Sequence, residues 1–314
     1  MTRLEPGGRS RIIVGCDGRA ESADALAIAC LMATALDGEL IVGSVFEGRP
    51  SESEAEERSF FESCFSQVEE VLGGRSFHRR EISGSAVRGL KQLATLESAA
   101  LIVVGSTNRG SLGQAIPGST AEQLIHGANS PVLLAPKGFA QRVSIVKIGV
   151  ALDGLRESER ALEYGWRLAD RLGAKLEVLT VGPRYSALDQ ALSQDRDMSE
   201  RKLGDRVDAA LRMVPDGVAR LGQTLTGDPG EELVKASHDL DVLITGSKGK
   251  GAIGSLALGS VSGDLVRSAH CAVLVVPADH DVRRTFGRTA ERSVWRGEWR
   301  PRRHRDRLGP RGLA

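Results

Sequence analysis

The feature that most constrains the fold is an internal repeat. A glycine-rich stretch, LIVVGSTNRGSLGQAIPGST, is followed later in the chain by a second version, LITGSKGKGAIGSLALGSVS. The segments before these loops also match, because the Asp-Gly pair at Asp17 recurs 136 positions later at Asp153, while Gly105 and Gly246 lie 141 positions apart. Markers that recur in one order at a nearly constant offset predict two copies of one structural unit, with a small insertion in the second copy.

The length agrees with two domains. A chain of 314 residues, 41% of them hydrophobic, is long enough for two cores. We expect a first domain over residues 1–142, a second over 143–280 and a tail over 281–314. No apolar run approaches the roughly 18 residues of a membrane helix, and the N-terminus lacks the apolar segment of a signal peptide. The protein is therefore expected in the cytoplasm, with its four cysteines, which form no CxxC pair, in the reduced state.

Hydrophobic periodicity predicts alternating strands and helices in both copies. In the first copy the expected strands are 11–16, 40–45, 77–82, 101–104 and 132–134, and the expected helices are 20–36, one within 51–72, and 86–98. In the second copy the expected strands are 146–152, 176–181, 218–225, 242–245 and 272–276, with helices between them. Strands that are apolar throughout, such as LIVV, are typical of a sheet covered by helices on both faces. The predicted fold class is α/β, with two tandem, doubly wound, parallel-sheet domains of Rossmann-like type.

The second glycine-rich loop indicates a phosphate site. Ligands of open parallel sheets bind beyond the carboxyl ends of the strands. There Gly246 and Gly249 follow a strand, and Gly259 precedes a helix that begins with Ser260 and Ser262. Glycines allow backbone amides to approach an anion, and a helix N-terminus adds partial positive charge. The two hydroxyls complete a set of groups that fits a phosphate.

An acidic residue lies on the same edge of the predicted sheet. Asp153 ends the first strand of the second copy, where its carboxylate can accept hydrogen bonds from ribose hydroxyls. An Asp-Gly pair after a strand is, taken alone, most often only a turn. Combined with the phosphate loop, it favours a nucleotide.

These residues resemble the universal stress proteins, specifically the tandem, ATP-binding members, over about residues 11–277. The family signature is Gly, two residues, Gly, nine residues, Gly, then Ser or Thr, and the second copy matches it with Gly246, Gly249, Gly259 and Ser260. The resemblance implies an adenine nucleotide α-hydrolase-like fold and ATP, possibly with Mg²⁺, as the ligand.

The resemblance also implies roles for single residues in the second copy. Asp153 is expected at the ribose, and Ala151 and Val181 are expected on either side of the base. Ser262 is expected to hold the phosphates, together with the signature residues.

The first copy departs from the signature at one position. Its matching residues are Asp17, Val45, Gly105, Gly118 and Ser119, but Asn108 stands where the second glycine belongs. An asparagine tolerates the left-handed conformation, yet its side chain intrudes where backbone should meet phosphate. The first copy also has Thr107 and Arg109 in place of Lys248 and Lys250. We therefore expect the first site to be degenerate and the second to bind more tightly.

Other functional classes fit the chain less well. The string Gly249–Gly254 has the glycine spacing of dinucleotide-binding folds, but it follows the fourth strand instead of the first. The chain has no P-loop, its six histidines form no HxxxH pair, and no residues suited to ATP hydrolysis are evident. Neither copy has the Ser-Gly-Gly-x-Asp-Ser loop of adenylating relatives. Binding without turnover is the favoured interpretation, and a ligand-free scaffold, a slow ATPase and an adenylating enzyme remain alternatives.

The C-terminal segment is strongly basic. Residues 281–314 contain eleven arginines, no lysine and four acids, which gives a formal charge of +7. So few apolar residues predict a disordered tail, although basic residues around Trp295 and Trp299 are also suited to nucleic acid or an anionic surface. The family resemblance implies an intramolecular pseudo-dimer joined through the last strands, a possible homodimer of tandems, and a stress or energy-state response through an unidentified protein partner.

Overall fold

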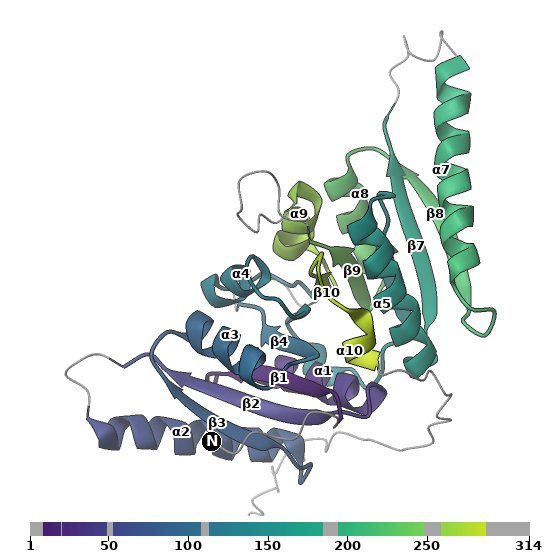
Figure 1. The fold of residues 1–314 in the computed structure, drawn as a ribbon. Helices are drawn as coiled ribbons and strands as arrows, with labels where there is room; N and C mark the ends of the chain where they lie inside the picture. Colours follow the sequence, from purple (N-terminus) through teal and green to yellow (C-terminus); the bar gives the residue numbers. More distant parts are fainter. Residues whose placement is uncertain are drawn as a thin grey trace, which may run out of the picture.

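The computed structural model of the protein describes six stretches of the chain. They are residues 9–19, 21–48, 53–107, 113–184, 194–247 and 259–286. Within them, strands and helices alternate in two successive halves that lie side by side (Figure 1). None of the helices in these stretches is long and apolar enough to span a bilayer.

The elements of the first half follow the predicted order. They are β1 (Arg11–Cys16), α1 (Glu21–Ala35), β2 (Glu39–Phe46), α2 (Glu54–Leu72), β3 (His78–Ser83), α3 (Ala86–Leu96), β4 (Leu101–Gly105), α4 (Ser119–Ile125) and β5 (Val132–Ala135). Local signals set the ends of α2: Ser53 and Glu56 form a capping box at its start, and Gly73 ends it with a φ of 60°.

The second half repeats the order after a short 3₁₀ turn, η1 (Phe139–Gln141). Its elements are β6 (Lys147–Ala151), α5 (Arg156–Leu172), β7 (Lys175–Gly182), α7 (Gln194–Met213), β8 (Arg220–Thr226), α8 (Pro229–Ala236), η2 (Ser237–Asp239), β9 (Val242–Gly246), α9 (Ser260–Ser268), β10 (Ala272–Val276) and α10 (Val282–Phe286). The predicted strands are confirmed, with bounds that differ by one or two residues.

The strands form one sheet in the order β3-β2-β1-β4-β5-β10-β9-β6-β7-β8. All neighbours within each half are parallel, which confirms the predicted doubly wound domains. The halves meet where β5 and β10 pair antiparallel, with Leu133 opposite Leu274. The joining of the two copies through their last strands is therefore confirmed.

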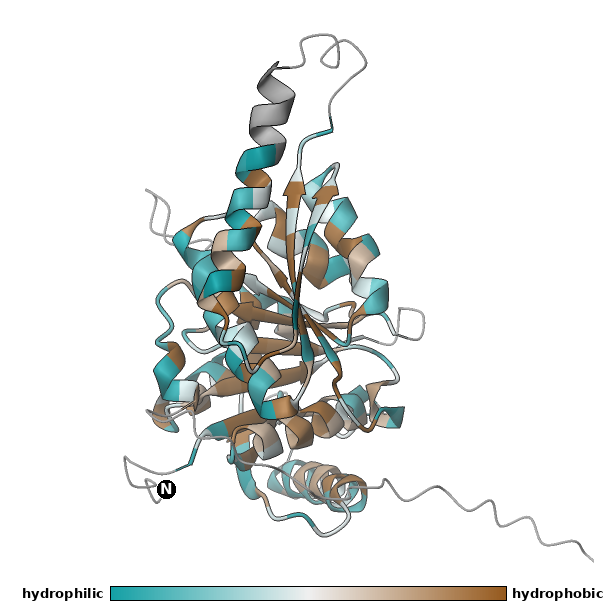
Figure 2. Cartoon of the chain, turned by 90° about the vertical axis from the view of Figure 1, so that its right-hand side faces the viewer, coloured by the Kyte–Doolittle hydropathy of each residue, from teal (hydrophilic) through white to brown (hydrophobic). Residues whose placement is uncertain are grey.

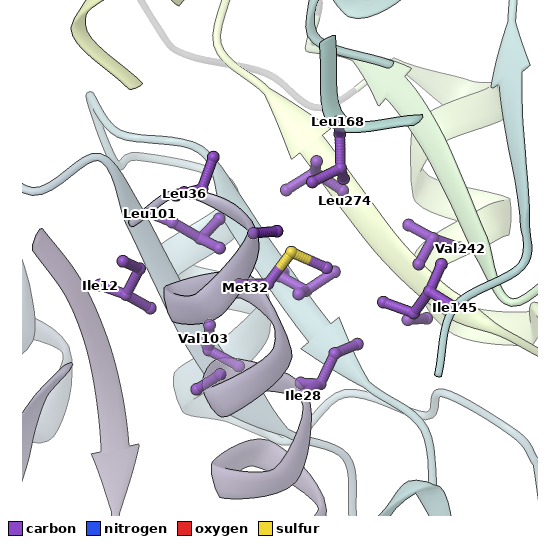
Figure 3. Packing of buried hydrophobic residues seen from close by; sticks show 14 of the residues in the cluster. Ile12, Ile28, Met32, Leu36, Leu101, Val103, Ile145, Leu168, Val242 and Leu274 are labelled. Carbon is purple, nitrogen blue, oxygen red and sulfur yellow. The ribbon is translucent and has the colours of Figure 1, made fainter. Parts of the chain in front are cut away.

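Helices cover both faces of this sheet. One core lies beneath α1, α2, α5 and α10, and the other lies beneath α3, α4, α8 and α9. Figure 2 shows the apolar residues gathered in the strands and the hydrophilic ones on outer helix surfaces. The first core crosses the boundary between the halves, since Met32 of α1 lies between Val103 of β4 and Leu274 of β10 (Figure 3). The halves are thus packed together.

A buried carboxylate fixes the joint between the halves. Asp24 of α1 is 7% exposed, and it accepts hydrogen bonds from the backbone N–H groups of Gly138, at 2.8 Å, and Ala140, at 2.7 Å. Burial raises the pKa of this carboxyl, while the two N–H groups act in the opposite direction. The connection between the domains is therefore held by specific contacts with α1.

One expectation is corrected. The predicted tail begins too early, because residues 282–286 form α10, whose Phe286 contacts the ring of Tyr164 edge-on at 4.9 Å between centroids. The hydroxyl of Ser10 also donates to the carbonyl of Thr285, so α10 contacts both halves. The remainder of the predicted tail, 287–314, lies outside the described residues.

Candidate functional site

A cavity of about 320 Å³ lies at the carboxyl ends of β6, β7 and β9. Seven of the eight residues predicted for the second site line it: Ala151, Asp153, Val181, Gly246, Gly259, Ser260 and Ser262. The eighth, Gly249, lies outside the described residues, as do Lys248 and Lys250. The volume lies at the lower end of the range for small-molecule sites.

One wall of the cavity is apolar. Ala151 at the end of β6 and Leu179 and Val181 of β7 form it, with Leu233 of α8 beside them. Parallel pairing places β6 and β7 with Ala151 opposite Leu179, which brings the two strand ends to one edge. Such a wall suits a flat, weakly polar ring.

The turn after β6 presents a carboxylate. Asp153 Oδ1 accepts a hydrogen bond from the backbone N–H of Leu155 at 2.8 Å, and Gly154 adopts a φ of 81°. The Ser158 hydroxyl donates to the Leu155 carbonyl at 2.8 Å instead of to Asp153. Among the described residues, no group donates to Oδ2 of Asp153, whose side chain is exposed at the cavity. Asp153 closes a turn and still offers an acceptor to a ligand.

Opposite this turn, α9 begins at the cavity. Gly259 is its N-cap, with extended backbone and no side-chain hydrogen bond to the first turn. Ser260 follows and is exposed. The first amides of a helix lack intrahelical acceptors and carry partial positive charge, so this end of α9 favours an anion.

Ser262 is placed differently from expectation. It is 4% exposed, and its hydroxyl donates to the Gly246 carbonyl at 2.9 Å and lies 3.2 Å from the Thr245 hydroxyl oxygen. Its hydrogen therefore ties α9 to the end of β9. Ser262 lines the cavity, but its hydroxyl is engaged in joining α9 to β9 and is not a free donor.

One residue at the cavity was not predicted from the sequence. Arg206 of α7 lines it, and its Nε lies 2.6 Å from where a Cβ on Gly154 would be. It is exposed, and no acidic group among the described residues pairs with it. The sequence does not single out Arg206, because α7 carries charged residues at many positions. Arg206 gives the cavity a positive charge beside the Asp153 turn.

The first domain has a cavity at the equivalent place, of about 1060 Å³. All five residues predicted there line it, namely Asp17, Val45, Gly105, Gly118 and Ser119. Phe46 and Phe60, which were not predicted, also line it, with ring centroids 5.4 Å apart. Asn108 and Arg109 lie outside the described residues.

The two acidic residues differ in their partners. In the first domain, Asp17 Oδ1 accepts from the Ser22 hydroxyl at 2.9 Å and from the Arg19 N–H at 3.1 Å. Its Oδ2 lies 3.5 Å from the Arg19 guanidinium. The carboxylate of Asp17 therefore has more partners within its own turn than the carboxylate of Asp153. In the described part of the chain, no three His, Cys, Asp or Glu side chains cluster as metal ligands.

Comparison with known proteins matches this geometry to a family. The model of the universal stress protein family matches residues 8–136 and 145–277. The crystal structure of a universal stress protein from Archaeoglobus fulgidus covers 85% of this chain and 98% of its own, with a TM-score of 0.62 and 18% identity, a likeness of fold alone.

Curated relatives carry the same family name. A universal stress protein of Mycolicibacterium smegmatis is 27% identical over 191 residues, which are 57% of this chain and 62% of that protein, less than two thirds of its length. One of Mycobacterium bovis is 27% identical over 213 residues, 64% of this chain and 67% of the relative. Because the family model matches both halves, the chain belongs to the universal stress protein family and carries two tandem copies of its domain.

Proposed function

We propose that the protein binds ATP in the cavity of the second domain. The observation that carries this proposal is the convergence of an apolar wall, a carboxylate with a free oxygen and a helix N-terminus without a side-chain cap on one cavity. Each matches one part of a nucleotide, since a base, a ribose and a phosphate chain differ in polarity and charge.

Different residues are proposed to contact the base, the ribose and the phosphates. Ala151 and Val181 contact the base, and Asp153 accepts from ribose hydroxyls. The amides after Gly259 and the Ser260 hydroxyl hold the phosphates. Mg²⁺ would be held mainly by the phosphates, as this ion keeps most of its waters and takes few protein ligands.

The first domain is proposed as the weaker site. Asp17 already accepts from Ser22 and Arg19, so a ribose would have to displace these donors. No comparable donor acts on Oδ2 of Asp153 among the described residues. The asymmetry supports one tight site per chain.

The wider role follows from the family. We propose that the protein acts in the cytoplasm in a response to stress or energy state, through a protein partner that distinguishes its ATP-bound and ATP-free forms. A ligand alters partner affinity only where the partner discriminates between the two forms.

The test is calorimetric titration of ATP and Mg²⁺ into nucleotide-free protein. Gly259→Trp fills the second cavity, and Gly118→Trp is the matched variant in the first, since both glycines are extended N-caps of equivalent helices. We expect one ATP bound to the wild type, lost in Gly259→Trp and retained in Gly118→Trp. Absence of binding to the wild type would refute the proposal, and circular dichroism of each variant excludes unfolding as the cause.

A further inference from the structure

Two cysteines that are 48 positions apart in sequence lie in contact in the first domain. Cys16 is the last residue of β1, and Cys64 lies in α2, with 3.3 Å between the two sulfur atoms. Both side chains are buried, at 4% and 1% exposure. A disulfide bond is about 2.05 Å long, so the two sulfur atoms need to approach by only slightly more than about 1 Å to form one.

The surrounding backbone holds the two sulfurs together. Gly18, in the turn after β1, has a φ of 73°, and a Cβ built on it would lie 3.5 Å from the Cα of Cys64. The turn therefore rests directly on α2. In the second domain, Leu152 takes the place of Cys16, so the pair belongs to the first copy alone.

The contact changes the acidity of the pair. The hydrogen bond with Cys16 lowers the pKa of Cys64, although burial and the nearby carboxylate of Asp17 oppose the shift. The same hydrogen bond, together with burial, raises the pKa of Cys16. When the pair loses one proton, the remaining S–H of Cys16 donates to the Cys64 thiolate. A thiolate is the reactive form of cysteine.

The other two cysteines lack these properties. Burial raises the pKa of Cys30 and of Cys271, and neither contacts another thiol within the described residues. Cys16, in contrast, lines the cavity of the first domain, which gives a small oxidant a route to the pair.

We propose that Cys16 and Cys64 are an oxidisable dithiol that forms a disulfide with a peroxide as the oxidant. The ionised sulfur of the pair attacks one peroxide oxygen, the O–O bond breaks, and the leaving hydroxide takes the proton of the other thiol as water. The second sulfur, now a thiolate, attacks the sulfenic sulfur, so that the S–S bond forms and the S–O bond breaks; the leaving hydroxide takes from solvent the proton that the pair first released and becomes the second water. Two thiols are oxidised by two electrons in total, and hydrogen peroxide is reduced to two waters.

The bond would act on the adjoining cavity. Cys16 immediately precedes Asp17, and α2, which carries Cys64, also carries Phe60 on the cavity wall. Oxidation would fix α2 to the end of β1 and hold these two walls at one separation. Any effect on a bound nucleotide rests on the proposed function, but the disulfide itself does not.

The test is treatment of the folded, full-length chain with hydrogen peroxide, followed by alkylation of remaining thiols and non-reducing peptide mapping. We expect loss of two thiols, a chain lighter by two hydrogen atoms, and one peptide pair joining Cys16 to Cys64. Dithiothreitol should restore both thiols. Because the thiolate reacts, the oxidation rate should rise with pH as the pair loses its first proton.

Matched variants separate this pair from general oxidation. Cys30→Ala should form the disulfide as the wild type does, while Cys64→Ala should form none. Cys30 and Cys271 should stay reduced in the wild type, which shows that the protein remained folded. Retention of all four thiols, or a disulfide to Cys30 or Cys271, would overturn the proposal whether or not the protein binds ATP.

Discussion

The backbone carbonyl of Glu157 lies where a side chain on Gly246 would begin: a Cβ there would be 2.7 Å from the carbonyl oxygen. The first domain repeats the relationship, with 2.8 Å between a Cβ on Gly105 and the Glu21 carbonyl oxygen. Because backbone atoms cannot move aside as the end of a flexible side chain can, these glycines let α5 and α1 approach the strand ends. The first glycine of each loop is thus needed for packing, apart from any ligand.

Replacement of Gly246 by alanine should therefore destabilise the fold. Gly246→Ala should lower the free energy of unfolding by about 1–3 kcal/mol through overpacking, measured by urea unfolding. Gly204→Ala is the control, because the Cβ position on this α7 glycine has no neighbour within 4 Å. It should raise stability slightly, as alanine is the better helix former. A Gly246→Ala protein as stable as the wild type would disprove the packing role.

Arg206 should contribute to binding without contributing to folding. Arg206→Ala should weaken ATP binding by about 3–10-fold, since a partly exposed charge near an anion contributes on the order of 1 kcal/mol. The unfolding midpoint should not change, because the side chain is exposed. Arg212→Ala, also exposed on α7, controls for the loss of one positive charge. Equal affinities of the two variants would remove Arg206 from the site.

Helix α10 should stabilise the whole chain. Phe286 is 6% exposed and packs on Tyr164, which is fully buried. Phe286→Ala should cost about 3–5 kcal/mol, the usual range for removing a buried ring. Arg283→Ala, on the exposed side of the same helix, should cost almost nothing. Thermal unfolding of both variants measures the difference, and similar losses would argue against a packed α10.

His280 should make stability depend on pH. It is 8% exposed, with Nε2 2.9 Å from Thr285 Oγ1. Burial lowers its pKa from 6.5 to about 4; Arg284 and Arg160 act in the same direction, and Asp281 opposes them. Unfolded chains take up this proton at higher pH than folded ones. The contribution of neutral His280 to the free energy of unfolding is therefore full above pH 6.5 and is lost as the pH falls toward 4. The loss should approach about 3 kcal/mol.

Urea unfolding at about pH 7 and about pH 4.5 tests this dependence, since these values bracket most of the expected titration. His280→Gln keeps a polar side chain of similar size without a proton to gain. The drop in stability between the two pH values should be smaller in this variant by most of the His280 contribution. An identical drop in both proteins would show that other groups cause it.

The fold was predictable because its signals are local or repeated. The offsets between Asp17 and Asp153 and between Gly105 and Gly246 predict the tandem, and apolar runs separated by amphipathic stretches predict the strand order. Glycine spacing located the second cavity for the same reason. A loop and the following helix are neighbours in sequence, so their joint chemistry can be read directly.

The remaining features depend on contacts between distant residues. Arg206 reaches the cavity from a helix whose charges all look alike in sequence, and Cys64 meets Cys16 across 48 positions. Asp17 and Asp153 are both followed by a glycine and by a serine five positions on, but the Ser22 hydroxyl donates to Asp17 while the Ser158 hydroxyl donates to a backbone carbonyl, and Arg19 lies beside Asp17 where the second copy has Leu155. Helix α10 was missed because a five-residue segment with two large apolar side chains lacks a periodic pattern.

The antiparallel pairing of β5 with β10 determines which strand edges remain open for association with another chain. The last strand of each copy pairs with the last strand of the other, so neither strand has a free edge for pairing with a further subunit. Covalent linkage makes this contact independent of dilution, and the two copies always occur in a one-to-one ratio. One copy can therefore depart from the glycine signature, as the first does at Asn108, while the other keeps it, and the sheet still joins one copy of each kind.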